Sequence, residues 1–297
     1  MNEPVKVGFC VAYDWELLQY ALPLVYKDSD IICLSIDKDR MSWANQSYAF
    51  DNERFYALIN SIDTDHKIKF LEEDFHIATL SPSENEVRQR ELMAKFMGSG
   101  GWQIQLDCDE YFLNFTGFVQ FLRKLPSNSY QDVNVCCAIM TLFKQVEGGF
   151  LSIPFHSKNK IEFFQIASRN PAFTYGRRNG YFNIYTDFVI LHQSWARSAQ
   201  DVYDKIANWG HKNDFDTQAY FERWNTLSAE NYAAFTDFHP INPPLWSSLV
   251  LMQANSIGDL IKNPPGIELP WNKFDLAIKN NRNLARLRGV WHKLFRS

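Results

Sequence analysis

Strand-like and helix-like patterns alternate through the first 107 residues, and this alternation limits the chain to very few folds. Short apolar runs typical of buried strands are predicted at residues 6–13, 30–37, 67–71 and 102–106. Amphipathic helices are predicted between them at residues 15–26, 51–62 and 87–97. Strands joined by helix-length connections cannot form hairpins, so we expect a mainly parallel sheet with right-handed crossovers and helices on both faces.

Polar residues and glycines predict where these helices begin and end. Asp14 is expected to cap the first helix, and Ser83 with Glu86 is expected to form a capping box at the third. Gly98 is expected to end the third helix shortly before the fourth strand begins. These boundaries place the residues that follow each strand in short loops.

Beyond Asp107 the pattern changes, and the later strands are expected to be more antiparallel. A short helix is predicted at residues 115–125, with strands at residues 133–143, 150–154, 161–167 and 181–191. Later helices are predicted at residues 199–211, 217–224 and 247–260. The predicted fold is therefore α/β, a mixed and mainly parallel sheet flanked by helices, with a domain at 1–215 and a mainly helical C-terminal extension at 216–297.

Composition and charge exclude several classes of protein. The 30 Lys and Arg residues against 34 Asp and Glu give a formal net charge of −4, which argues against a nucleic-acid partner. Five cysteines without a C-x-x-C pair favour reduced, buried thiols and a cytoplasmic protein. We expect neither a secretion signal at the start nor a membrane-spanning helix, because no apolar run is long enough.

A basic segment, residues 279–297, carries apolar residues at helical spacing. Such a helix can pack on the core with its basic side in water. It can also lie on an anionic membrane, as a peripheral contact at the inner face. The sequence leaves both arrangements open.

Five D-x-D pairs occur in the chain, and their positions relative to the predicted strands distinguish them. Ligands of open α/β sheets bind beyond the carboxyl ends of the parallel strands. Residues 107–110, Asp-Cys-Asp-Glu, directly follow the fourth strand, whereas the pairs beginning at Asp28 and Asp63 precede strands. Carboxylate oxygens suit Mg²⁺ or Mn²⁺, whose other positions are commonly filled by water and phosphates. We therefore predict a divalent-cation site at residues 107–110.

The stretch EVRQRELMAKFMGSGGWQIQLDCDEYF, residues 86–112, resembles the signature of GT-A fold glycosyltransferases, particularly family 2 and similar bacterial enzymes. The stretch HQSWARSAQDVYDKIANWGH, residues 192–211, is similar to a later part of these enzymes. The resemblance covers residues 5 to 215. It implies a Rossmann-like GT-A fold and a hexosyltransferase-type enzyme of cell-surface glycan synthesis. Such an enzyme uses Mn²⁺ or Mg²⁺ with a nucleotide-sugar, most commonly a UDP-sugar, and a saccharide or lipid-linked acceptor.

The resemblance also implies roles for single residues. Asp109 would ligate the metal, and Asp107 would contact the metal shell or the ribose. His192, at the end of a late strand, would be a further metal ligand. Asp37 would contact the nucleotide, and Arg90 would steady the nucleotide or the acidic loop.

Transfer from a nucleotide-sugar also needs cations for the diphosphate and a base for the acceptor hydroxyl. Arg197, Lys205 and His211 follow the late strand and are the candidate diphosphate contacts. Asp187 and Asp214 are the candidate bases. The Glu-Asp pair and the Q-x-x-R-W motif of family 2 are missing, so the sequence does not identify the base.

Two other functions stay open from the sequence. A nucleotidyltransferase shares the sheet and a metal-held diphosphate, but it usually has a glycine-rich loop after the first strand, where this chain has Tyr13-Asp14-Trp15. A non-catalytic protein that binds a glycan or a partner would keep the fold without turnover. The donor, the acceptor, the linkage, its stereochemistry and the oligomeric state are not specified by the sequence.

Overall fold

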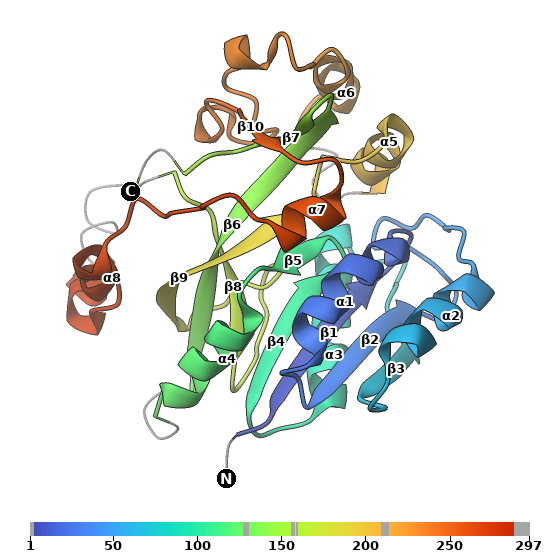
Figure 1. Ribbon diagram of the computed structural model, residues 1–297. Coiled ribbons are helices and arrows are strands. Elements are labelled where there is room, and N and C mark those ends of the chain that lie inside the picture. Colours follow the sequence, from blue (N-terminus) through green and yellow to red (C-terminus); the bar gives the residue numbers. More distant parts are fainter. Residues whose placement is uncertain (1–2, 127–130, 156–157, 159, 209–213, 288–297) are drawn as a thin grey trace.

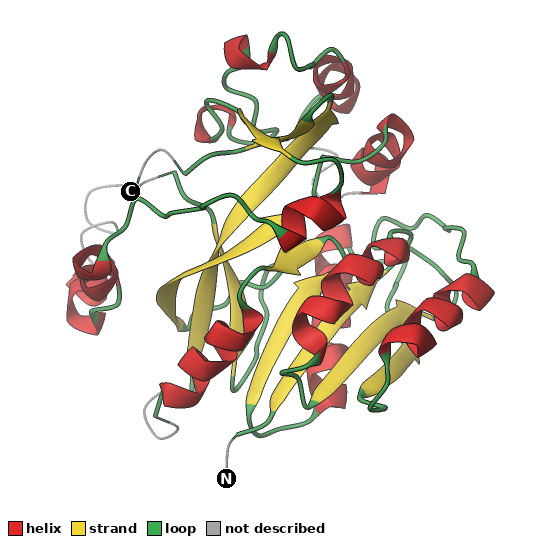
Figure 2. Cartoon of the chain, viewed as in Figure 1, coloured by secondary structure: helices red, strands yellow, loops and turns green. Residues whose placement is uncertain are grey.

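The computed structural model describes residues 3–126, 131–155, 158, 160–208 and 214–287. Within them the chain forms a ten-stranded mixed sheet flanked by helices (Figures 1 and 2). Its first half is parallel, with the spatial order β4-β1-β2-β3. These strands are β1 (Val5–Val11), β2 (Ile31–Asp37), β3 (Ile68–Glu73) and β4 (Trp102–Asp107). The predicted parallel sheet is confirmed, and the architecture is compatible with a Rossmann-like α/β fold.

Helices cover both faces of this parallel part, as the alternating pattern predicted. One face carries α1 (Leu18–Tyr26), α2 (Asn52–Ile62) and α4 (Phe115–Lys124), while α3 (Pro82–Met97) lies on the other face (Figure 1). A 3-10 turn, Trp15–Leu17, precedes α1. The residues that follow β1, β2 and β4 are thereby brought to one edge of the sheet.

The second half of the sheet is mainly antiparallel, as predicted. Its strands are β5 (Glu110–Phe112), β6 (Val133–Val146), β7 (Gly149–Ser152), β8 (Phe163–Ser168), β9 (Phe182–His192) and β10 (Val250–Gln253). β8 joins β4 to β6 in antiparallel register, while β9 runs parallel to β6 and antiparallel to β5. In this register Glu110 lies opposite His192, so the acidic loop after β4 meets the end of β9.

The helix predicted at residues 247–260 is wrong. Val250–Gln253 instead form β10, which pairs antiparallel with β7 and satisfies the backbone groups along that strand. Ser256 then begins a separate short helix, α7 (Ile257–Lys262), by accepting a hydrogen bond from the backbone of Asp259. The remaining helices are α5 (Ala199–Asn208), α6 (Thr217–Asn225) and α8 (Lys273–Lys279), with 3-10 turns at Tyr232–Ala234 and Pro243–Leu245.

Two of the predicted helix caps are also wrong. The capping box of α3 is formed by Ser81 and Glu84, because Pro82 occupies the first turn and starts the helix earlier than predicted. Asp14 makes no capping hydrogen bond and instead accepts one from Arg197. The predicted end of α3 is confirmed at Gly98, whose φ of 73° suits glycine.

A small hydrophobic cluster of Cys10, Cys33, Met93 and Met97 packs α3 against β1 and β2. Two larger clusters support the rest of the sheet. The larger one lies beneath α1, α2 and α4, and the smaller one surrounds Phe143 at the far end of β6. The smaller cluster contains Trp195, Trp224 and Trp246, which are only 2%, 2% and 5% exposed. These tryptophans are therefore core residues and do not form open stacking surfaces for a sugar ring. The smaller cluster spans the boundary predicted at residue 215, and the division into two regions stays a prediction.

All five cysteines are buried as free thiols, as predicted. Across the described part of the chain, no helix is both long and apolar enough to cross a bilayer.

Candidate functional site

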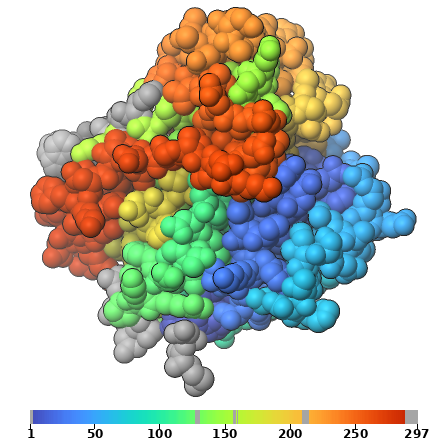
Figure 3. Space-filling model, in the orientation of Figure 1, coloured from blue at the N-terminus to red at the C-terminus, as the bar shows by residue number. Residues whose placement is uncertain are grey.

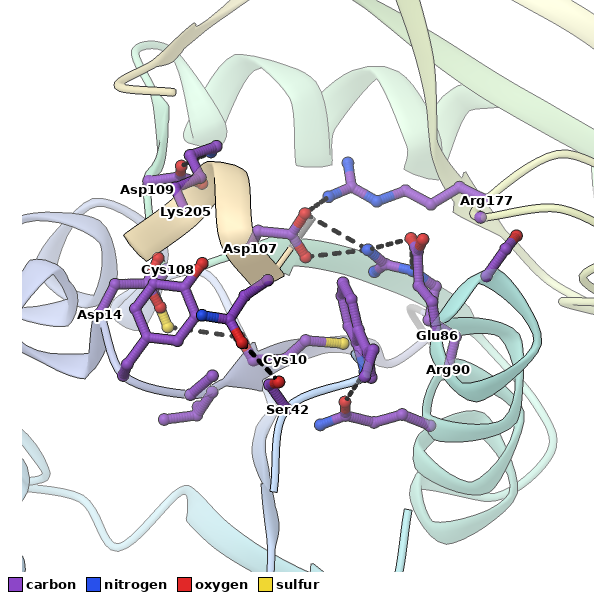
Figure 4. Close-up of a pocket in the computed structure, with 18 of the residues that line it drawn as sticks. Cys10, Asp14, Ser42, Glu86, Arg90, Asp107, Cys108, Asp109, Arg177 and Lys205 are labelled. Carbon is purple, nitrogen blue, oxygen red and sulfur yellow. Dashed lines mark hydrogen bonds and ion pairs between the residues drawn. The ribbon is translucent and has the colours of Figure 1, made fainter. Parts of the chain in front are cut away.

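A cavity of about 350 Å³ opens at the edge where β1, β2 and β4 end (Figure 4). Its walls come from the loops after these strands, from α3 and α5, and from the end of β9. Nine charged residues are part of the lining, among them Asp14, Asp37, Asp107, Asp109, Arg177 and Lys205. The D-x-D pair therefore lies where the sheet topology predicted a ligand site.

Asp107 is held between two arginines. Nη2 of Arg90 lies 3.0 Å from Oδ1 of Asp107, and Nη2 of Arg177 lies 2.9 Å from Oδ2. Burial alone would raise the pKa of Asp107, but the two guanidinium groups hold it below its ordinary value. Arg90 also pairs with Glu86 at 2.9 Å and is 1% exposed, so it links α3 to the acidic loop, and its contact with a nucleotide stays a prediction.

Glu110 is fully buried directly behind the D-x-D pair. Both of its carboxylate oxygens accept from Nη2 of Arg177, at 2.9 and 2.8 Å, and Oε2 also accepts from the backbone N–H of Asp107 at 3.1 Å. Burial raises the pKa of Glu110, and the charge of Arg177 opposes that rise. Arg177 was missed from the sequence, where residues 176–180 showed only a turn between strands.

Asp109 is 3% exposed and lies among three basic side chains. Oδ1 is 3.4 Å from Nε2 of His192, while Oδ2 contacts Nη2 of Arg197 and lies 3.4 Å from Nζ of Lys205. Burial alone would raise the pKa of Asp109, but His192, Lys205 and Arg197 hold it well below its ordinary value. The carboxylate is therefore charged, and its predicted neighbours His192, Arg197 and Lys205 are all brought to it.

Arg197 and Lys205 differ in how they could meet a ligand. Arg197 bridges Asp109 and Asp14, with Nη2 3.0 Å from the Asp14 carboxylate, so it is committed to the protein. Lys205 lines the cavity from α5, and burial lowers the pKa of its ammonium group although Asp109 favours the charged form. His211, the third candidate diphosphate contact, lies outside the described residues.

Asp37 lines the cavity at the end of β2, but its carboxylate is engaged by the backbone. Oδ1 accepts from the N–H groups of Asp39 and Met41, both at 3.0 Å. Oδ2 accepts from those of Phe75 and His76, at 3.0 and 3.2 Å. Asp37 therefore ties together two loops of the cavity wall, and its contact with a nucleotide stays a prediction.

Aromatic side chains after β1 and β2 form one wall of the cavity and were not singled out from the sequence. Trp43 and Tyr48 line it, and Nε1 of Trp43 donates to Oε1 of Gln89 at 2.6 Å. Tyr48 meets Tyr13 edge to face at 6.2 Å. These residues lie in loops without periodicity, so no sequence pattern could have placed them together.

Neither candidate base lines the cavity. Asp187 is an exposed residue of β9, and Asp214 is exposed near Tyr175 at the cavity rim. A different carboxylate, Glu162, directly precedes β8 and comes two residues before the cavity residue Phe164, although Glu162 does not itself line the cavity. Phe164 in turn meets His192, with ring centroids 6.0 Å apart.

Glu162 is held by the hydrophobic cluster around Phe143. Its Oε2 accepts from Nε1 of Trp246 at 2.8 Å, while no described residue donates a hydrogen bond to Oε1. Burial raises the pKa of Glu162, opposed by the Trp246 hydrogen bond and by the charges of His192 and Arg178. Sequence analysis missed Glu162 because it precedes a strand and carries no motif.

Asp109 and His192 supply an oxygen and a nitrogen that could bind a divalent cation, but they are only two side chains. The described residues contain no group of three or more His, Cys, Asp or Glu side chains arranged to hold a metal. Mg²⁺ and Mn²⁺ commonly take only one or two protein ligands together with water and phosphates, however. Two atoms that bind one such ion at right angles, each roughly 2.1 Å from it, lie about 3 Å from each other. The distance between Nε2 of His192 and Oδ1 of Asp109, 3.4 Å, is close to this value.

The charges that line the cavity also fit a cation that arrives with an anionic ligand. Five carboxylates line it, from Asp14, Asp37, Glu86, Asp107 and Asp109. Four cationic side chains line it, from Arg90, Arg177, Arg178 and Lys205. Arg197, which pairs with Asp14 and Asp109, brings the cations to five, so the five carboxylates are balanced and the cavity has no surplus positive charge for a nucleoside diphosphate. A divalent cation would offset the negative charge of such a ligand.

Comparisons with known proteins identify no family for this chain. A scan against sequence models of protein families gives no match. A search of curated proteins gives no significant relative. The functional argument therefore depends on the site itself.

Proposed function

We propose that this protein is a glycosyltransferase of GT-A type that moves a sugar from a nucleoside-diphosphate sugar to a saccharide or lipid-linked acceptor. The observation that carries the proposal is the position of Asp109 beside His192 in a cavity at the carboxyl edge of the parallel sheet. This is the edge at which open α/β sheets bind nucleotides. The aromatic wall formed by Trp43 and Tyr48 supplies an apolar surface for a base or a sugar ring.

Asp109 and His192 would hold Mn²⁺ or Mg²⁺. A bound ion there would act as a Lewis acid toward the diphosphate leaving group. Lys205 lies beside Asp109 on the cavity wall and would place a second positive charge near the phosphates. Arg90 and Arg177 keep Asp107 charged and fixed, so that the acidic loop does not have to reorganise when the donor binds.

Glu162 is the proposed general base. Glu162 directly precedes β8, and the charges of His192 and Arg178 act on its carboxylate, while Phe164, two residues further on, lines the cavity beside His192. Oε2 is fixed by Trp246, so Oε1 can take the proton of the acceptor hydroxyl as the oxygen attacks the sugar. Asp187 and Asp214 are not used, because both are exposed. Glu162 lies just outside the cavity lining as well, but it is close enough to His192 and Arg178 for their charges to lower its pKa against the rise that burial causes.

The proposal is tested by ligand-dependent stabilisation. UDP, GDP, CDP and dTDP are each added with Mn²⁺, Mg²⁺ or EDTA, and the melting temperature is measured. A ligand that binds only the folded state stabilises it by about 2.7 kcal/mol at a hundredfold excess over its Kd. We expect one nucleotide, which the family resemblance suggests is UDP, to raise the melting temperature only with metal.

The variant His192→Gln is expected to weaken that metal-dependent shift, raising the apparent metal Kd at least about tenfold because a ligand is lost. His66→Gln is the matched control, since His66 is exposed in the loop before β3, away from the cavity. A nucleotide shift of equal size in EDTA and in Mn²⁺ would contradict the metal assignment. Absence of a shift with all four nucleotides would contradict the donor class, and nucleotide binding without turnover on any acceptor would identify a binding protein.

A further inference from the structure

The C-terminal segment of the described chain exposes large apolar side chains that the proposed reaction does not use. Phe274 and Ile278, one helical turn apart on α8, are 71% and 36% exposed. Leu284 and Leu287, in the following helical residues 282–287, are 39% and 65% exposed. Phe274 is more exposed than any other large apolar side chain among the described residues. We call residues 273–287 the C-terminal surface.

The same segment is basic. Residues 273–287 contain four Lys and Arg residues and one acid, Asp275. Within the C-terminal surface, Lys273, Arg282 and Arg286 are exposed. Its one acid, Asp275, is paired with Lys158 at 2.6 Å and is therefore compensated.

Contacts with the sheet hold the C-terminal surface in place, so its exposed side chains face solvent. Asn280 exchanges two hydrogen bonds with the backbone of Tyr185 in β9, at 2.8 and 2.9 Å. Trp271 stacks on Phe163 at 4.8 Å, and Lys279 lies over the Trp271 ring at 5.0 Å. Figures 1 and 3 show α8 beside β9, separated from the helices that flank the parallel strands.

We propose that the C-terminal surface binds the face of an anionic lipid bilayer. The face of such a bilayer has anionic headgroups above an apolar interior. The C-terminal surface is complementary to it, because its exposed apolar residues are flanked by Lys and Arg and its one acid is paired. A second copy of this chain is less suited, because two such surfaces would bring like charges together. The inference stands apart from the proposed reaction, since none of these residues lines the cavity.

Sedimentation of the full chain with vesicles tests the proposal. Phosphatidylcholine vesicles with about 30% phosphatidylserine are compared with pure phosphatidylcholine. We expect binding to the anionic vesicles alone, reduced on going from about 0.05 to about 0.5 M NaCl because salt screens the charges. Lys273→Gln with Arg286→Gln is expected to lower the partition coefficient by roughly fivefold for each charge removed.

The apolar contribution is tested with Phe274→Ser combined with Leu287→Ser, which is expected to lower vesicle binding at least about tenfold. Phe96→Ser is the matched control, because Phe96 is 47% exposed on α3 at a distance from this surface. All these side chains are exposed, so the variants are expected to fold, and melting temperatures check this. Equal binding to neutral and anionic vesicles, no binding to either, or a dimer that the apolar variant dissociates would each overturn the proposal.

Discussion

Replacing Arg177 by methionine is expected to lower the free energy of unfolding by about 3–5 kcal/mol. Arg177 is the guanidinium that compensates Glu110, which is fully buried, and it also pairs with Asp107. Without it Glu110 keeps only the N–H of Asp107 as a described hydrogen-bond partner, so it must stay charged while buried beside Asp107 or bind a proton. Urea denaturation followed by circular dichroism measures the change.

A matched control is available at the next residue. Arg178 also lines the cavity, but it is exposed and forms no ion pair with the described residues, so Arg178→Met is expected to change stability by less than about 0.5 kcal/mol. The double variant Arg177→Met with Glu110→Gln removes the uncompensated charge and is expected to recover more than half of the loss. Equal effects of the two arginine variants, or no recovery in the double variant, would contradict the assigned role of Arg177.

The regular part of the fold was predictable because periodicity alone fixes it. The strands and helices up to Asp107 alternate with clear spacing, and helix-length connections leave a parallel sheet as the simple solution. Residues 247–260 were misassigned because a short apolar run suits either a helix or a strand. The segment forms a strand because it pairs with β7, which lies far away in the sequence. The local sequence pattern contains no information about that pairing.

The candidate site likewise contains some residues that could be predicted from the sequence and others that could not. Asp107 and Asp109 follow a predicted strand, so topology placed them at the ligand edge, and His192 follows from the end of a later strand. Arg177 and Glu162 were not found, because each lies in or beside a loop and gains its role only from a partner distant in sequence. Asp37 is the opposite case. It lies at the position predicted from the sequence, but four backbone N–H groups already satisfy its carboxylate.

These contacts explain why the acidic loop is rigid before any ligand arrives. Asp107 and Asp109 are both charged, and each is surrounded by cations supplied from α3, α5 and the loops beside β8 and β9. A site arranged in this way needs little reorganisation when charge develops on a leaving group. It lacks, however, a proton acceptor among the residues of that loop, because each carboxylate is already paired with a cation.

Glu162 meets that requirement, and Glu162→Gln is expected to lower kcat by about 10²–10⁴-fold, the usual contribution of a general base. The amide keeps an oxygen that can accept from Nε1 of Trp246, so the fold and the donor-induced thermal shift are expected to be retained. Turnover is measured with the nucleotide-sugar selected by the thermal-shift screen. Asp187→Asn is the control and is expected to keep turnover within about twofold, since Asp187 is exposed and outside the cavity.

The pH dependence separates a base from a residue that only supports the site. Burial raises the pKa of Glu162 above its ordinary value of 4.5, and a base must be deprotonated to act, so turnover of the wild type is expected to fall as the pH drops through that raised pKa. The Gln variant cannot titrate there, so its residual turnover is expected to lose this acid limb. If Glu162→Gln is slow but keeps the same acid limb, another group is the base and Glu162 acts by holding Trp246 in place.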